Sequence, residues 1–110
     1  AVQAIEEVRS AGWFQGFRPT EAREIIRIYQ AAKRDDLLPG LYVEFLSNGR
    51  NREPAVFVLL LRDLIAKRDA DQLVFWANEY KDAHPQFTPA MDELIKLAEA
   101  GEWEKLASML

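Results

Sequence analysis

Residues 54–69 read PAVFVLLLRDLIAKRD, and the choice between helix and strand for this stretch decides the fold class. The apolar run over residues 55–61 suits a buried strand as well as a buried helix. The pattern continues from Arg62 to Lys67 without a turn residue, and Pro54 stands at its start, where a helix tolerates proline. The length therefore favours a helix that is covered on every face by other helices.

Helical spacing also characterises the segments on both sides of this stretch. Apolar residues recur at i, i+3, i+4, i+7 and i+10 from Pro19 to about Arg34. Further helices are expected over residues 1–11, from Pro39 to Asn48-Gly49, between Arg68-Asp69 and His84-Pro85, from Pro89 with Thr88 as N-cap to Gly101, and from Trp103 to Leu110. We therefore predict an all-α chain of seven helices joined by short loops.

A period of 34 to 35 residues organises these helices. Pro19, Pro54 and Pro89 are 35 residues apart, and the helices that they open carry the apolar pairs Ile25-Ile26, Leu59-Leu60 and Leu94-Ile95. The sequence Ala-Lys-Arg-Asp occurs at residues 32–35 and again, 34 residues later, at 66–69. Because one helical hairpin cannot bury its apolar stripe alone, such a period predicts hairpins that stack on one another.

The period and its local motifs resemble those of tetratricopeptide and pentatricopeptide repeats. Residues 73–80 followed by Pro85 resemble a second tetratricopeptide helix with its closing proline, and residues 98–103 resemble the turn of such a repeat. Asn48-Gly49 followed by Pro54 is similar to the end of a pentatricopeptide unit. The chain departs from the pattern at Leu73 and Leu106, where a small residue is expected. The resemblance implies an α-solenoid of tandem antiparallel helical hairpins.

The expected organisation is a single all-α domain over residues 1–110. It comprises a leading helix and loop (1–18) and candidate hairpins over 19–53, 54–88 and 89–110. A compact helical bundle is the alternative, because loops of similar length would give a similar pattern. The chain opens inside a helical pattern at Ala1, so we expect a segment of a longer array.

The residues that catalysis or metal binding would need are sparse. The chain has no cysteine and one histidine, His84, and it lacks the glycine-rich, nucleophile-elbow and zinc-binding motifs. The acidic pairs Asp35-Asp36, Asp69 with Asp71, and Asp92-Glu93 are expected to be solvated, with both carboxylates ionised. We therefore expect no enzymatic activity, no cofactor, no metal site and no small-molecule substrate, and a loop or capping role for His84.

Charge is distributed unevenly along the chain. Residues 1–68 hold 11 Lys and Arg against 9 Asp and Glu, whereas residues 69–110 hold 3 against 9. The basic half leaves RNA binding open, with Arg23, Arg27 and Arg62 as candidate phosphate or peptide contacts on the first helices of hairpins. The alternative for these arginines is ordinary surface charge paired with Glu21, Glu24 and Asp63.

Aromatic residues supply the other candidate contacts. Trp13 and Phe14 lie between two glycines and Phe17 directly follows the second, in a loop that no helical period buries, and all three are candidates for a partner surface. Trp76 and Trp103 lie on apolar stripes and are expected in the core.

The leading functional hypothesis is a non-catalytic protein-interaction scaffold that binds a protein or peptide. A pentatricopeptide-like RNA-binding component and a compact helical inhibitor, immunity or phage adaptor protein are the alternatives. No apolar run approaches the roughly 20 residues that span a bilayer, so a soluble, intracellular protein without membrane insertion is expected.

Overall fold

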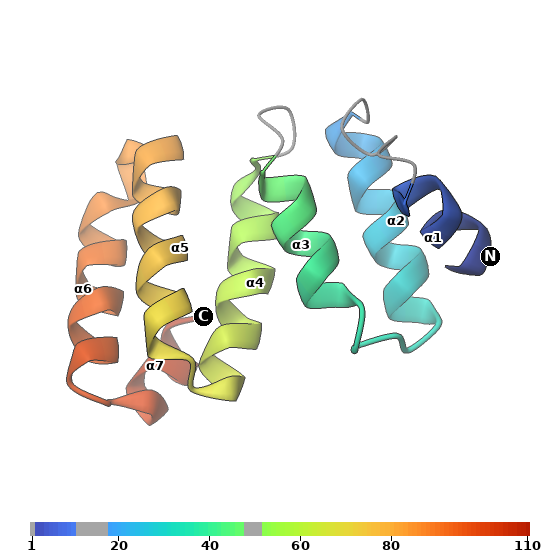
Figure 1. The fold of residues 1–110 in the computed structure, drawn as a ribbon. Helices are drawn as coiled ribbons and strands as arrows, with labels where there is room; N and C mark the ends of the chain where they lie inside the picture. Colours follow the sequence, from blue (N-terminus) through green and yellow to red (C-terminus); the bar gives the residue numbers. More distant parts are fainter. Residues whose placement is uncertain (1, 11–17, 48–51) are drawn as a thin grey trace. The chain divides into compact units, whose positions relative to one another are not determined.

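The computed structural model describes residues 2–10, 18–47 and 52–110 (Figure 1), and over these residues the chain is helical with no strand. The elements are α1 (Val2–Ser10), α2 (Pro19–Ala31), α3 (Leu38–Leu46), α4 (Pro54–Lys67), α5 (Ala70–Ala83), the 3-10 helix η2 (Pro85–Phe87), α6 (Thr88–Glu99) and α7 (Trp103–Met109). The all-α prediction is confirmed, and the stretch that decided it is the helix α4.

The chain divides into two compact units, Ala1–Val56 and Phe57–Leu110, with the division inside α4. In the first unit α2 packs against both α1 and α3. Its buried stripe comprises Ala22, Ile25, Ile26 and Tyr29. The hydroxyl of fully buried Tyr29 donates a hydrogen bond to Glu6, which ties α1 to α2 by a polar contact.

In the second unit α5 packs against η2 and α6, and α6 packs against α7. Helix α4 joins this core through Phe57, whose ring stacks on Tyr80 of α5 at a centroid distance of 4.7 Å and an interplanar angle of 3°. Trp76 closes the same cluster with its ring 6.5 Å from that of Phe57. Aromatic pairs in such arrangements add to the free energy gained from their burial.

The turns between α2 and α3, α4 and α5, and α6 and α7 have the same backbone structure. Each holds a left-handed residue: Lys33 (φ 56°), Arg68 (φ 55°) and Gly101 (φ 72°). The amides of Lys33 and Arg34 donate to Gln30 and Tyr29, those of Arg68 and Asp69 to Ile65 and Leu64, and those of Gly101 and Glu102 to Ala98 and Leu97, at 2.9 to 3.2 Å. This hydrogen-bond pair is the Schellman motif, which ends a helix by satisfying its last carbonyls.

Burial follows the same register around the first two of these turns. Eight positions, counted from the left-handed residue, are buried around both turns. They lie 11, 8, 7 and 4 residues before that residue and 5, 8, 9 and 12 residues after it. Around Lys33 they are Ala22, Ile25, Ile26, Tyr29, Leu38, Leu41, Tyr42 and Phe45. Around Arg68 they are Phe57, Leu60, Leu61, Leu64, Leu73, Trp76, Ala77 and Tyr80. The same spacing of 35 residues thus relates the turns and the buried positions.

The third turn keeps only part of this register. Around Gly101 the buried residues are Met91, Leu94, Ala98 and Leu106. Leu94 and Leu106 fall at the shared positions 7 before and 5 after the turn, whereas Met91 and Ala98 lie one residue later along α6 than the shared positions. The stripe of α6 is therefore rotated relative to those of α2 and α4.

Several details differ from the sequence-based prediction. The counterpart of Ile25-Ile26 is Leu60-Leu61, both buried, while Leu59 is half-buried. Helix α3 begins at Leu38, one residue before its proline. Thr88 is the first residue of α6, and its hydroxyl donates to the Pro85 carbonyl at 2.7 Å, so it does not cap the helix. Trp103 is half-buried at the start of α7 rather than in the core.

The left-handed residues give a direct test of the turn structure. A non-glycine residue with a positive φ destabilises the folded state by about 1 kcal/mol, so Gly101→Ala should lower the free energy of unfolding by about 1 kcal/mol. No atom lies within 4 Å of the added methyl group, which leaves backbone strain as the cause. Conversely, Lys33→Gly and Arg68→Gly should each raise the free energy of unfolding by about 0.5 kcal/mol, measured by urea denaturation.

The control for these variants is Lys96→Gly, which places glycine inside α6 at an exposed position. Helical glycine destabilises by about 1 kcal/mol, so this variant should move the denaturation midpoint in the opposite direction. Destabilisation by Lys33→Gly and Arg68→Gly of the same size as by the control would contradict the left-handed turns.

Candidate interaction surfaces

The aromatic residues Trp13, Phe14 and Phe17 fall outside the described residues. Their proposed role in partner binding therefore stays a prediction from the sequence.

Arg23 and Arg27 lie on the exposed face of α2, and each is next to a carboxylate. The Nη1 of Arg23 is 3.6 Å from Oε1 of Glu53, and the Nη1 of Arg27 is 2.7 Å from Oε1 of Glu24. Both arginine side chains are more than half exposed, so each pair stabilises the fold by at most ~1 kcal/mol. The pairs nevertheless cancel positive charge locally, which weakens the attraction that α2 would exert on RNA phosphates.

The partners of the arginines differ in part from those that the sequence suggested. Glu24 does pair with Arg27, as predicted. Glu21 instead accepts a hydrogen bond from the backbone amide of Arg18 at the start of α2. Asp63 pairs with Lys67 at 2.9 Å on α4, which leaves Arg62 with a different partner.

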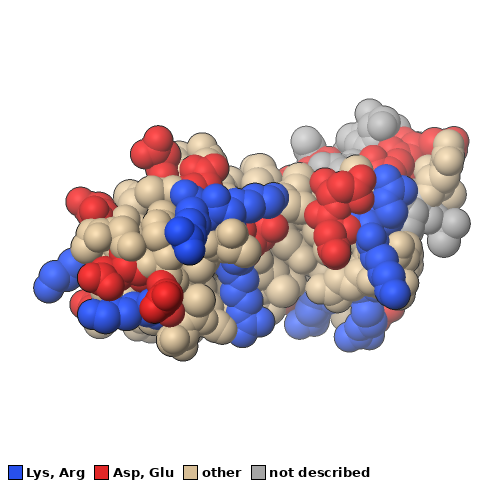
Figure 2. All heavy atoms as spheres, turned by 90° about the horizontal axis from the view of Figure 1, so that it is seen from below, with Lys and Arg blue, Asp and Glu red and all other residues tan. Residues whose placement is uncertain are grey.

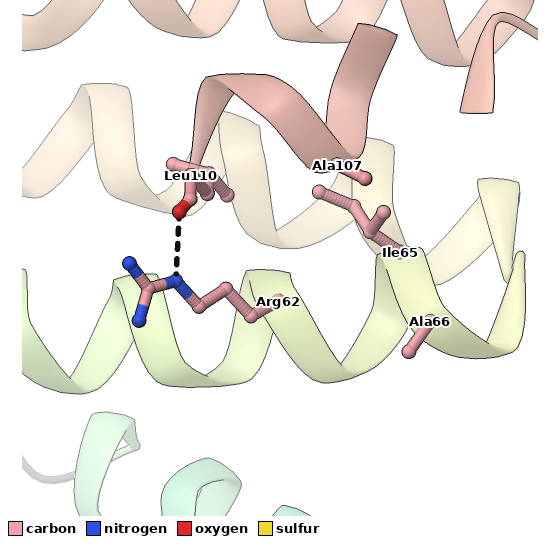
Figure 3. A pocket seen from close by; sticks show the side chains of 5 residues that line it. All are labelled: Arg62, Ile65, Ala66, Ala107 and Leu110. Atoms are coloured by element: carbon pink, nitrogen blue, oxygen red, sulfur yellow. Dashed lines mark hydrogen bonds between the residues drawn. The ribbon is translucent and has the colours of Figure 1, made fainter. Parts of the chain in front are cut away.

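Arg62 lies beside a pocket between α7 and the part of α4 that belongs to the second unit (Figure 3). The pocket has a volume of about 180 Å³ and is lined by Arg62, Ile65 and Ala66 of α4 and by Ala107 and Leu110. The Nε of Arg62 donates a hydrogen bond to a main-chain oxygen of Leu110 at 3.0 Å. We call this hollow the Arg62 pocket. No pattern in the sequence brings residues 107 and 110 to α4.

His84 is at the C-terminal end of α5, as the predicted capping role requires. Its backbone amide donates to the carbonyl of Tyr80 at 2.8 Å. Its ring meets those of Phe57, Tyr80 and Phe87 edge-on, at centroid distances of 5.7 to 6.3 Å. Burial raises the pKa of the Tyr80 phenol above its usual value. The imidazole thus belongs to an aromatic cluster, and no group of potential metal ligands occurs among the described residues.

One member of each acidic pair has a local structural role. Asp69 accepts a hydrogen bond from the amide of Gln72 and caps α5, and Asp92 accepts from Lys81 at 2.9 Å. Arg34 contacts both carboxylate oxygens of Asp36, at 3.1 and 3.2 Å, and this hydrogen bonding lowers the pKa of Asp36 below its usual value. General acid catalysis requires a raised pKa, so Asp36 is unsuited to that role.

The surface also presents a residue that the sequence analysis did not single out as exposed. Phe75 on α5 is 51% exposed and meets the buried ring of Trp76 edge-on at 5.2 Å. Lys and Arg lie next to Asp and Glu across the face shown in Figure 2. Over the described part of the chain, no helix is long and apolar enough to cross a membrane.

Comparisons of the chain with protein-family models, curated proteins and solved structures find no match.

The Arg34–Asp36 pair predicts a defined response to pH. Because the folded-state pKa of Asp36 is lowered, the pair stabilises the fold above the ordinary aspartate pKa, and this contribution is lost as pH falls through the lowered value. Arg34→Gln should return the pKa of Asp36 toward its ordinary value, measured from the carboxyl carbon shift by NMR. Lys33→Gln, which removes a neighbouring charge, should leave the pKa of Asp36 unchanged, and an equal change in both variants would contradict the pairing.

Proposed function

We propose that this chain is a non-catalytic helical-repeat module that acts as a protein-interaction scaffold. The observation that carries the proposal is the shared register of the turns at Lys33 and Arg68. The same eight positions are buried around both, and the same backbone hydrogen bonds close both. Tandem repeats stabilise one another through adjacent faces and present their remaining surface to partners.

The position of the charged residues supports a protein partner over RNA. RNA binding depends on cations that are free to replace counterions along the phosphate backbone. On α2 the candidate cations Arg23 and Arg27 are next to Glu53 and Glu24. Residues 69–110 carry three times as many acidic as basic residues, and this negative charge disfavours the binding of a polyanion such as RNA. A partner recognised through mixed charge and apolar side chains suits these surfaces better.

Two observations favour a second candidate, a compact helical inhibitor or adaptor. The hydrogen bond from Arg62 to Leu110 joins α4 to the end of the chain beyond α7, and the stripe of α6 departs from the shared register. In that case residues 54–110 form a closed bundle, and a partner binds an outer face of the bundle rather than a series of equivalent hairpins.

The first experiment is affinity capture from lysate with the intact chain, with and without ribonuclease, followed by mass spectrometry. A scaffold should retain the same protein partners after ribonuclease treatment. Arg23→Gln with Arg27→Gln should leave these partners in place, because the two arginines already face carboxylates. The matched control is Lys96→Gln, which removes one exposed positive charge from α6.

An RNA ligand would produce a different set of results. The captured material would disappear with ribonuclease, and the affinity for single-stranded RNA would fall steeply with salt. Loss of Arg23 and Arg27 would reduce the slope of that salt dependence by about 2. This combination would overturn the protein scaffold in favour of the RNA-binding alternative.

A further inference from the structure

Phe75 is the most exposed large apolar side chain among the described residues, at 51%. The buried residues of its helix α5 are Leu73, Trp76, Ala77 and Tyr80. Because successive residues turn by about 100° around a helix, Phe75 lies about 150° from the centre of that stripe. Its ring therefore stands on the side of α5 that faces water, where packing within the second unit does not require an aromatic residue.

The contact with Trp76 keeps a face of the Phe75 ring accessible. The two rings meet edge-on, with centroids 5.2 Å apart and planes at 87°, and Trp76 itself is buried. A ring in an edge-on pair covers at most one face of its neighbour. With half of the side chain exposed, at least one face of Phe75 therefore remains for another group. The face of an aromatic ring attracts cations, because it carries the negative part of the ring quadrupole.

Two carboxylates lie beside the ring along the water-facing side of α5. Asp71 is one helical turn before Phe75 and Asp82 is two turns after it, both within about 40° of Phe75 around the helix axis. Both are exposed, and neither forms an ion pair within the described part of the chain. Glu79 also lies on this side, but it has an interaction of its own and is not counted. We call the surface of Asp71, Phe75 and Asp82 the Phe75 face.

No basic residue of α5 offsets this charge. The one lysine of the helix, Lys81, lies about 120° from Phe75 around the axis, and its Nζ contacts Asp92 of α6 at 2.9 Å. Residues 69–110 as a whole carry 9 Asp and Glu against 3 Lys and Arg. The Phe75 face thus combines an accessible aromatic ring with negative charge on both sides, which complements a cationic partner.

We propose that the Phe75 face binds an arginine-containing segment of a partner protein. One guanidinium stacks on the ring of Phe75 and donates hydrogen bonds to the carboxylate of Asp71. A second arginine donates to Asp82, which lies about 10 Å further along the helix axis, the reach of about three extended residues. This inference rests on the proposed function, because it names the chemistry of the partner that the scaffold binds.

The ring and the carboxylates together select arginine. A guanidinium is planar, so it can stack on an aromatic face while it forms paired hydrogen bonds with a carboxylate. A lysine ammonium satisfies the carboxylates but has no plane to stack. A nucleic-acid base could also stack on Phe75, but Asp71 and Asp82 would then repel the phosphates on either side of it.

The test uses the intact chain and three capped peptides, with NMR detection at the ring protons of Phe75 and the indole N–H of Trp76. The probe is acetyl-Arg-Gly-Gly-Arg-amide. One control replaces both arginines with lysine, which keeps the charge, and the other replaces both with citrulline, which keeps the shape without the charge. The probe should bind with a Kd on the order of millimolar. The lysine peptide should bind about threefold more weakly, and the citrulline peptide about tenfold more weakly.

Variants of the Phe75 face connect this binding to the proposed contacts. In the wild type, the δ-methylene protons of one arginine should shift upfield because they lie over the ring. Phe75→Leu keeps an apolar side chain, and it should abolish both this shift and the preference for arginine over lysine. Asp71→Asn and Asp82→Asn should each weaken the probe about threefold. The matched control is Glu93→Gln, which removes an exposed carboxylate from α6 and should leave the affinity unchanged.

Equal binding of the three peptides would overturn the proposal, and so would an equal loss of affinity in Glu93→Gln and Asp71→Asn. Binding of a five-uridine oligonucleotide at Phe75 more tightly than the probe would also overturn it, because the ring would then serve RNA. The proposed function is tested separately. A captured protein partner that the Phe75→Leu, Asp71→Asn double variant still retains would reject the Phe75 face and leave the scaffold in place.

Discussion

The shared turn at Lys33 and Arg68 is the constraint on which the described helices depend. A left-handed residue follows both α2 and α4, and the Schellman hydrogen bonds fix how the next helix leaves it. Counting from that residue places Leu38 and Leu73 at the same buried position. A turn of another length would rotate the second helix and move its apolar stripe toward water. The turn therefore sets the burial register on both sides.

The all-α class and the helix boundaries follow from periodicity and from proline, and these were predictable. The 35-residue spacing of Pro19 and Pro54 coincides with the buried register of α2 and α4 because each proline begins its helix at the same distance from the turn. The spacing of Pro89 does not extend that register. Its helix begins at Thr88 directly after η2, and its buried stripe is displaced by one residue. A short 3-10 helix of this kind has no strong sequence signal.

The candidate contacts were less predictable than the fold, since they depend on distances between residues far apart in sequence. Glu53 lies 30 positions from Arg23, and Leu110 lies 48 positions from Arg62. Local spacing on one helix identified the Arg27–Glu24 pair because residues three apart are neighbours there. It assigned Asp63 to Arg62, whereas Asp63 pairs with Lys67, one helical turn later. The Arg62 pocket requires α7 to lie beside α4, which periodicity does not encode.

The displaced register of α6 and the position of α7 are connected. When positions are counted from Gly101, the buried residues Ala98 and Met91 lie one residue later along α6 than the shared register requires. A shift of one residue corresponds to a rotation of about 100° around the helix axis. The second helix of this hairpin buries Leu106 at the shared position, yet it leaves Met109 36% exposed where its counterparts Leu41 and Trp76 are buried. The α6–α7 hairpin thus keeps the shared turn but covers less of its second helix. The pocket between α7 and α4 is lined by Ala107 and Leu110, on either side of Met109 in the sequence, with Arg62 at its edge.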